Sequence, residues 1–272
     1  MGGATSSCEQ DALESLYKTL RGRDLSSRTI QYVHTVIRKM LADAVKRGHL
    51  TRNVADLIER PKARKTEMRV WTAEHLRAFL KHVSEERLYA LWLIAATSGM
   101  RRGELAGLRW VDVDLEAGRC SIQQALVSTY QRATVSAPKT PKSRRSIPLP
   151  AETVAALKSW HARQGQERLK LGEGYEGQGL VFTREDGSPM RPDLLTDSFE
   201  RYITKAGLPK IRLHDLRHTF ATLALQAGEH PKVVSEILGH SSISITLDTY
   251  SHVIPAMSEQ ATSRVAGLIF GA

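Results

Sequence analysis

The sequence predicts a mainly helical α+β protein with a small β-sheet. Apolar residues recur at helical spacing along most of the 272 residues. Short stretches that read as strands lie only between about residues 119 and 183. A basic stretch around Pro61 precedes them. We therefore expect a helical region at residues 1–60, a linker at 61–71 and a larger mixed region at 72–272.

The first region is expected to hold two or three helices. A short helix is predicted over about residues 9–20, and Ser26 or Ser27 can cap a longer one that Gly48 can end. The apolar residues of the longer helix follow helical spacing: Ile30, Val33, Ile37, Met40, Leu41 and Val45. So few helices make a thin core, and we expect this region to be incomplete or to lean on a partner.

The second region is expected to open with two helices. Thr72 can cap AEHLRAFLKHV, and Ser84 can cap EERLYALWLIAATSG, which is apolar nearly all round and should be central. RCSIQQALVS and RRSIPLP read as strands around a polar loop, and GLVFT is a further short apolar piece. Helices are predicted over the remaining segments: 151–163, about 193–206, 214–227, 231–238, 243–250 and 256–268.

Charge and cysteine content narrow the function. The net charge of +10 and pI near 9.7 favour a polyanionic partner such as nucleic acid, although a solvated basic surface explains them about as well. Cys8 and Cys120 are far apart, which indicates neither a zinc ribbon nor a disulfide framework and fits a reducing, cytoplasmic setting. No apolar run is long enough to span a membrane, so we expect no membrane partner.

Six side chains are together suited to a phosphodiester. They lie in TSGMRRGELAGLRW, APKTPKSRRSIPLP, LHDLRHTFAT and EILGHSSISITLDTYSH, and are Arg101, Lys139, His214, Arg217, His240 and Tyr250. Each alone has a structural explanation. Together, guanidinium groups can bind phosphate oxygens, lysine and histidine can transfer protons, and a phenol can attack. No metal ligand set or phosphate-binding glycine loop accompanies them, so we expect no metal and no ATP as cofactor.

These stretches resemble the motifs of the tyrosine site-specific recombinases of the phage integrase type. SGMRRGEL resembles the family's first-arginine box, LHDLRHTFAT its H-x-x-R box and LGHSSISITLDTY its histidine-to-tyrosine box. The resemblance extends over almost all of residues 70–253. It implies a helical core-binding domain, about two-thirds present, and a tyrosine-recombinase catalytic domain. The helical tail at 256–272 is then expected to dock on a neighbouring protomer or to pack on its own domain.

The resemblance assigns the phosphate clamp and the acid. It implies that Arg101 and Arg217 hold the scissile phosphate. Lys139 is then the general acid that protonates the departing 5′ oxygen, and Lys142 is a rival for that role because the family's loop varies in length.

It also assigns the base and the nucleophile. His214 is implied to be the general base or a proton relay, and His240 to orient the phosphate. Tyr250 is implied to attack, leaving a 3′-phosphotyrosine and a free 5′ hydroxyl. His218 is expected to serve packing or phosphate support. Two carboxylates are expected to support the site, with ordinary helix salt bridges as the alternative: Glu104 and Asp215.

The implied function is strand cleavage and rejoining of double-stranded DNA, for integration or excision of mobile DNA. DNA contacts are expected from basic residues of the linker and the loop: Lys62, Arg64, Lys65, Lys142, Arg144 and Arg145. The expected assembly is a homotetramer on synapsed DNA, and a monomer or weak oligomer when free, at the nucleoid of a prokaryotic host. The alternatives are topoisomerase-like nicking and closing, or DNA binding with vestigial catalysis; the six filled positions argue against the latter.

Overall fold

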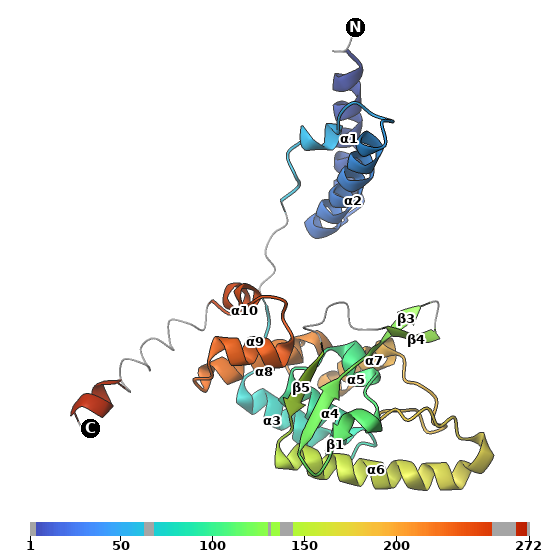
Figure 1. Ribbon diagram of the computed structural model, residues 1–272, viewed down its shortest axis with the longest axis vertical. Coiled ribbons are helices and arrows are strands. Elements are labelled where there is room, and N and C mark those ends of the chain that lie inside the picture. Colours follow the sequence, from blue (N-terminus) through green and yellow to red (C-terminus); the bar gives the residue numbers. More distant parts are fainter. Residues whose placement is uncertain (1–3, 63–67, 130–131, 137–143, 252–264, 271–272) are drawn as a thin grey trace. The chain divides into compact units, whose positions relative to one another are not determined.

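The chain folds into two compact units, Met1–Glu67 and Met68–Ala272 (Figure 1). The computed structural model describes the following residues: 4–62, 68–129, 132–136, 144–251 and 265–270. Its many helices and small antiparallel sheets confirm the predicted α+β class. Within the described residues, no helix combines the length and the apolar character needed to cross a membrane.

The first unit is built from two long helices and a short 3₁₀ turn: α1 (Ala4–Gly22), α2 (Ser27–Lys46) and η1 (Val54–Asp56). Ser26 caps α2 as predicted, since its hydroxyl accepts a hydrogen bond from the Thr29 N–H at 3.1 Å. A buried hydrogen bond of 2.8 Å between the Tyr17 hydroxyl and His34 Nδ1 joins α1 to α2. The core between these helices is small, and Met40 of α2 is 65% exposed.

The second unit contains eight helices among the residues described between 68 and 251: α3 (Ala73–His82), α4 (Tyr89–Ser98), α5 (Arg102–Ala106), α6 (Ala151–Leu171), α7 (Pro192–Lys205), α8 (Leu213–Gln226), α9 (Pro231–Leu238) and α10 (Ile243–Thr249). Helix α4 is central, as its all-round apolar sequence predicts, and contacts α3, α6 and α8. Helix α9 contacts both α8 and α10 (Figure 1). These contacts bring together the segments that carry the candidate residues.

Thr72 caps α3 as predicted, but the prediction that Ser84 caps the next helix is wrong. Helix α4 begins only at Tyr89, and the residues before it form turns. Arg87, within these turns, makes a two-pronged ion pair with Glu167 of α6 at 2.6 and 2.7 Å. It also donates to the Thr183 carbonyl at 2.9 Å. Such partners from distant segments compete with a local helix signal.

The strands form two separate antiparallel sheets: β1 (Val113–Asp114), β2 (Arg119–Ile122) and β5 (Arg145–Pro148) in one, β3 (Ala125–Thr129) and β4 (Arg132–Ser136) in the other. The stretch RCSIQQALVS is therefore two strands in different sheets, and not one. Strand β3 follows β2 in the chain but pairs only with β4, and it lies on α5. A Cβ on Gly103 or Gly107 would meet the Leu126 backbone at 2.5 or 2.9 Å, so these glycines permit that close approach. The stretch GLVFT takes part in two isolated bridges, Arg109 with Leu180 and Thr183 with Pro189, and forms no sheet strand.

Helix α6 extends to Leu171, beyond the predicted residue 163. The Gln164 side chain donates to Thr183 Oγ1 at 2.9 Å, and the Trp160 indole donates to the Val181 carbonyl at 2.6 Å. These bonds tie the middle of α6 to the segment carrying GLVFT and support its continuation. The bounds of α7, α8, α9 and α10 confirm the predictions to within one residue.

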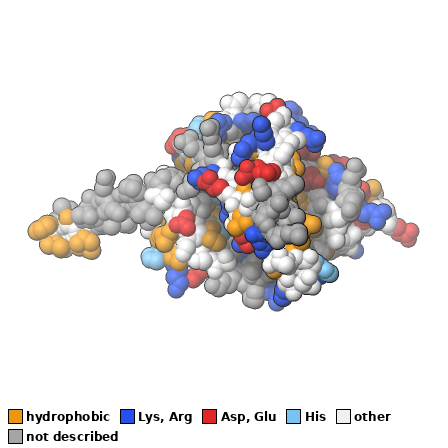
Figure 2. Space-filling view, turned by 90° about the horizontal axis from the view of Figure 1, so that it is seen from above, with side chains coloured by type: hydrophobic (Ala, Val, Ile, Leu, Met, Phe, Trp, Pro, Cys, Tyr) orange, Lys and Arg blue, Asp and Glu red, His pale blue; other side chains and the backbone are white. Residues whose placement is uncertain are grey.

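Of the predicted helix at 256–268, the part from 265 onward is described and helical, as are the two residues that follow it; the rest lies outside the described residues. The exposed fractions of its large apolar side chains run from 53% to 87%: Val265, Leu268, Ile269 and Phe270. Figure 2 shows apolar side chains gathered at this end of the chain (orange, left).

The second unit has two apolar clusters. The larger contains the mutually contacting rings of Trp71, Phe79, Trp92 and Phe199. The smaller lies among α8, α9 and the end of α10, and its buried members are Ala221, Leu225, Val234, Leu238 and Tyr250. The candidate nucleophile is thus part of a packed core.

Candidate active site

The end of α4 fixes the position of Arg217. Gly99 has φ +61°, and a Cβ there would lie 2.7 Å from Leu238 Cδ2 and 2.8 Å from Phe220 Cδ1. Glycine alone avoids both the left-handed strain and these clashes. The Gly99 carbonyl accepts a hydrogen bond from Arg217 Nη1 at 2.7 Å. Gly99, which ends α4, therefore also orients a guanidinium from α8.

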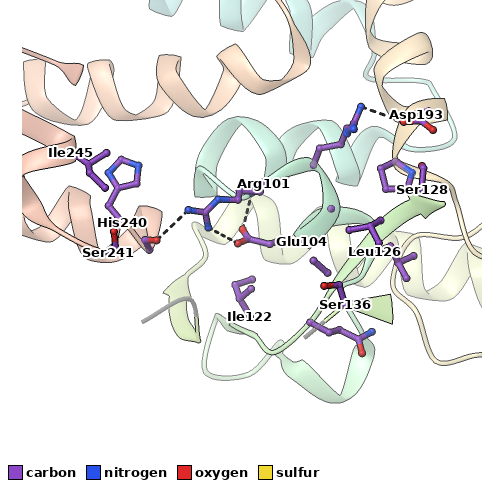
Figure 3. A pocket seen from close by; sticks show the side chains of 17 residues that line it. Arg101, Glu104, Ile122, Leu126, Ser128, Ser136, Asp193, His240, Ser241 and Ile245 are labelled. Carbon is purple, nitrogen blue, oxygen red and sulfur yellow. Dashed lines mark hydrogen bonds and ion pairs between the residues drawn. The ribbon is translucent and has the colours of Figure 1, made fainter. Parts of the chain in front are cut away.

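The end of α9 holds Arg101 in a matching way. Gly239, with φ +64°, ends α9, and its carbonyl accepts from Arg101 Nη2 at 3.2 Å. Arg101 Nη1 donates to Glu104 Oε1 at 2.8 Å, and the Arg101 N–H donates to Glu104 Oε2 at 2.8 Å. Figure 3 shows the Arg101 guanidinium between Glu104 and the turn that carries His240. The Arg101 side chain remains 39% exposed, so an anion can reach it.

Glu104 is buried between two guanidinium groups. Arg145 Nη1 and Nη2 donate to its two carboxylate oxygens at 3.0 and 2.8 Å, and Arg145 Nε donates to the Ile237 carbonyl at 2.5 Å. Burial acts to raise the pKa of Glu104, but hydrogen bonds and charge from Arg145 and Arg101 outweigh it and hold the pKa below its usual range. Glu104 is therefore an ionised carboxylate that locks Arg101.

Arg145 does not lie where a DNA-contacting side chain would be expected. Its side chain is only 6% exposed, because β5 carries it inward to Glu104 and to the end of α9. The geometry supports a structural role for Arg145 behind Arg101, in place of the direct DNA contact inferred from the sequence. Its neighbour Arg144 is exposed.

Helix α8 carries the exposed His214 and buries both Asp215 and Arg217. The Asp215 carboxylate accepts from the Arg212 N–H at 2.8 Å and from its guanidinium, which closes the start of the helix. Arg217 is 3% exposed, and burial and the charge of Arg101 lower its pKa to about 9, so it stays protonated at pH 7. The His214 side chain is exposed, and its pKa is lowered by partial loss of water and by Arg217.

His240 follows α9 and is oriented by Thr246. His240 Nδ1 and Thr246 Oγ1 are 2.8 Å apart, which leaves Nε2 as the ring's second polar atom. Burial, then the charges of Arg217 and Arg101, lower the pKa of His240 to about 4. The ring is therefore neutral at pH 7. The sequence interpretation missed Thr246, which has no local signal beyond its place on α10.

Tyr250 lies at the end of α10 with an exposed fraction of 0%. Its hydroxyl is 2.8 Å from His218 Nδ1, and burial raises its pKa to about 12. The sequence interpretation expected His218 to serve packing or phosphate support and missed this contact with Tyr250. The sequence shows that His214 and His218 are four residues apart, but nothing in it indicates that Tyr250, 32 residues after His218, is the partner of His218.

A pocket of about 740 Å³ opens beside Arg101, and Glu104, His240, Ile122 and Leu126 line it (Figure 3). Within the described residues, no group of three or more His, Cys, Asp or Glu side chains is placed to hold a metal ion. Lys62 is exposed and pairs with Glu59 at 2.8 Å. The other predicted basic residues lie outside the described part of the chain: Arg64, Lys65, Lys139 and Lys142.

Comparison with known proteins decides the family, because the pattern of the phage integrase family matches residues 69–257. The chain belongs to the phage integrase family. It is 31% identical to a tyrosine recombinase XerC-like protein of Caldanaerobacter subterraneus subsp. tengcongensis, over 94% of this chain and 70% of that protein. It is 26% identical to the ICEBs1 integrase of Bacillus subtilis, over 93% of this chain and 69% of that protein. The chain is thus a tyrosine recombinase, as its three motif boxes predict.

Solved structures share the recombinase's fold. The Tn1549 transposon integrase, in complex with a circular intermediate DNA, matches with a TM-score of 0.77 at 23% identity, over 94% of this chain and 85% of that one. The XerA recombinase matches with a TM-score of 0.59 at 20% identity, over 96% and 92% of the two chains. These likenesses confirm the predicted fold of the family.

Proposed function

We propose that this recombinase cuts and rejoins double-stranded DNA at specific sites through a 3′-phosphotyrosine formed by Tyr250. The observation that carries the proposal is the meeting of three motif boxes at one place. Arg101 comes from the first box, Arg217 from the second and His240 from the third, and hydrogen bonds from Arg101 and Arg217 to Gly239 and Gly99 tie the boxes together.

The two arginines and His240 supply the phosphate clamp. A pentacoordinate phosphoryl transition state carries more negative charge on its non-bridging oxygens than the diester does. Donors already oriented by carbonyl and carboxylate partners stabilise that charge without reorganising, which favours the transition state over the bound substrate. The neutral His240 adds a hydrogen bond through Nε2.

The strand exchange then runs in two mirrored steps. The Tyr250 oxygen gives its proton to a histidine base and bonds to phosphorus, the bond to the 5′ oxygen breaks, and Lys139 gives that oxygen a proton. A 5′ hydroxyl from a second strand reverses the step and releases the tyrosine. Since the phosphodiester energy is kept in the protein–DNA bond, the proposed reaction needs no ATP.

The buried position of Tyr250 adds a requirement. A hydroxyl with no exposed surface in the described structure cannot reach a DNA phosphate, so DNA binding must uncover the Tyr250 hydroxyl. The proposal extends to integration or excision of mobile DNA by a homotetramer on synapsed sites, in the cytoplasm. The integrases among the relatives favour this assignment over the two alternatives, topoisomerase-like nicking and closing and DNA binding with vestigial catalysis.

Covalent capture tests the proposal. The protein is incubated with a pool of nicked duplexes of randomised sequence, and the DNA that becomes covalently attached is sequenced. Digestion and mass spectrometry then locate the phosphorylated tyrosine. We expect the adduct on Tyr250, at a defined DNA sequence.

Tyr250→Phe is the control, because its ring keeps the packing of the apolar cluster while the nucleophilic oxygen is lost. It should bind the selected duplex as the parent does and form no adduct. Adduct formation by Tyr250→Phe, or an adduct on Tyr202, would contradict the assignment.

A further inference from the structure

The Tyr250 hydroxyl and His218 Nδ1 lie within hydrogen-bond distance, at 2.8 Å. The two side chains come from different elements, His218 from the middle of α8 and Tyr250 from the end of α10. Their ring centroids are 5.9 Å apart and their planes are tilted by 57°, so the polar atoms, at 2.8 Å, make the close contact. No other hydrogen bond to the Tyr250 hydroxyl joins it to a described side chain.

His214, to which the family resemblance gives the role of base or relay, stands one step further away. Its described ring contact is with His218, at 5.1 Å between centroids and perpendicular planes. The order of groups from the core outward is therefore Tyr250, half-buried His218 and exposed His214. This order forms a short path from the phenol to solvent.

At pH 7 the Tyr250 hydroxyl carries a proton and the His218 ring can accept one. Burial and His214 lower the pKa of His218 to about 4, so its ring is neutral at pH 7 and Nδ1 accepts when Nε2 carries the proton. The neighbouring charges that act on His218 are Asp215, Arg217 and Arg212, and the two arginines disfavour an imidazolium. A phosphodiester anion bound at Arg217 offsets that positive field, so DNA binding makes His218 a stronger base.

We infer that His218 holds the Tyr250 hydroxyl and takes its proton as the tyrosine attacks. The inference rests on the proposed function, since it needs Tyr250 to be the nucleophile. In the step, the Tyr250 oxygen forms a bond to phosphorus and its proton moves to His218 Nδ1. The electron pair of the breaking bond goes to the 5′ oxygen, which takes its proton from the general acid. The imidazolium passes its extra proton outward to solvent past His214, and the reverse step returns a proton to Tyr250.

The test is single-turnover cleavage of the nicked duplex selected by covalent capture on the parent protein. The variant is His218→Gln, whose amide oxygen can accept the phenol's hydrogen bond but takes no proton. We expect the adduct to form still on Tyr250, about 10²–10⁴-fold more slowly at pH 7. Its rate should rise with pH by roughly tenfold per unit toward the pKa of the phenol, because the phenolate must now form unaided. The parent rate should not show this rise.

The matched control is His82→Gln, an exposed histidine in the last turn of α3, which should keep the parent rate and pH profile. His218→Ala gives a second readout, because the missing ring leaves room for added imidazole to restore the rate at pH 7. A variant that was merely misfolded would gain nothing from imidazole.

Two results overturn the inference while leaving Tyr250 as the nucleophile. One is a His218→Gln rate that is unchanged, or lowered equally at every pH. The other is the pH-dependent loss and imidazole rescue appearing in variants of His214. Absence of any adduct with the parent protein, or an adduct on another residue, instead overturns the proposed function and this inference with it.

Discussion

At the scale of single residues, the candidate site depends on backbone carbonyls that end helices. The Gly99 carbonyl holds Arg217, and the Gly239 carbonyl holds Arg101. Each arginine thus gives one donor to a segment from a different motif box, Arg101 gives another to Glu104, and the proposed function assigns the remaining donors to the phosphate. A guanidinium carries five N–H donors, so it can serve both purposes.

The proposed acid is tested by Lys139→Ala. Cleavage of ordinary DNA should slow by about 10²–10⁴-fold, because the departing 5′ alkoxide is a poor leaving group without a proton. Replacing the bridging 5′ oxygen with sulfur makes a leaving group that needs no proton, so the variant should cleave this substrate near the parent rate. The measurement is single-turnover cleavage of both substrates.

Arg217→Ala provides the contrast, since its proposed role at the non-bridging oxygens gives no reason for rescue by sulfur. If Lys142→Ala is rescued and Lys139→Ala stays slow on both substrates, then Lys142 is the acid.

At the scale of elements, one buried ion cluster joins α5, β5 and the end of α9. Glu104 of α5 bonds both Arg101 and Arg145, and Arg145 of β5 also bonds the Ile237 carbonyl of α9. Removing one member of a buried ion pair leaves the others without a partner and without water. The cluster should therefore stabilise the domain in the same geometry that positions Arg101.

Glu104→Gln should lower the free energy of unfolding by about 3 kcal/mol at pH 7. The folded-state pKa of Glu104 is lowered, so its carboxylate contributes stability above the ordinary pKa of 4.5 and loses it as pH falls through the folded-state pKa. The difference between parent and variant should shrink correspondingly in acid. Urea unfolding at neutral and acid pH measures both effects.

Glu116→Gln is the control, because Glu116 is 91% exposed and pairs with Lys158 at the surface. It should change stability by less than about 1 kcal/mol. Equal effects of the two variants would show that the buried cluster contributes no more than a surface pair.

Gly239→Ala tests the turn that carries His240. A Cβ would lie 2.9 Å from Arg145 Nη1, and an alanine at φ +64° is strained by about 1–2 kcal/mol. Gly207→Ala is the control, since Gly207 has nearly the same φ of +65° and open space around it. We expect Gly239→Ala to lose more stability than Gly207→Ala, and it alone to slow cleavage. Equal losses of stability in the two variants, without slower cleavage, would mean that the Arg145 side chain moves aside for the new Cβ at no cost.

At the scale of the whole molecule, local signals and long-range contacts were predictable to different degrees. Thr72 and Ser26 mark helix starts through their own side-chain chemistry, so the sequence predicts them. The contact of His218 with Tyr250 spans 32 residues and that of Glu104 with Arg145 spans 41. No periodicity encodes such pairs, and a basic residue in a loop sequence reads as exposed whether or not a distant carboxylate buries it.

The net charge of +10 belongs to the whole chain, so its role in DNA binding needs a test that separates position from charge. Neutralising Lys62, Arg64 and Lys65 to Gln should weaken DNA binding. It should also flatten its salt dependence, because log K changes by about 0.9 per log unit of salt for each phosphate contact. The control neutralises three exposed cations of α6, which lowers the net charge by the same three units: Lys158, Arg168 and Lys170. Titrations at several salt concentrations give both slopes. A linker that crosses the DNA backbone changes the slope more than the α6 control does, whereas equal slopes would identify the linker as a solvated connector whose charge acts only at a distance.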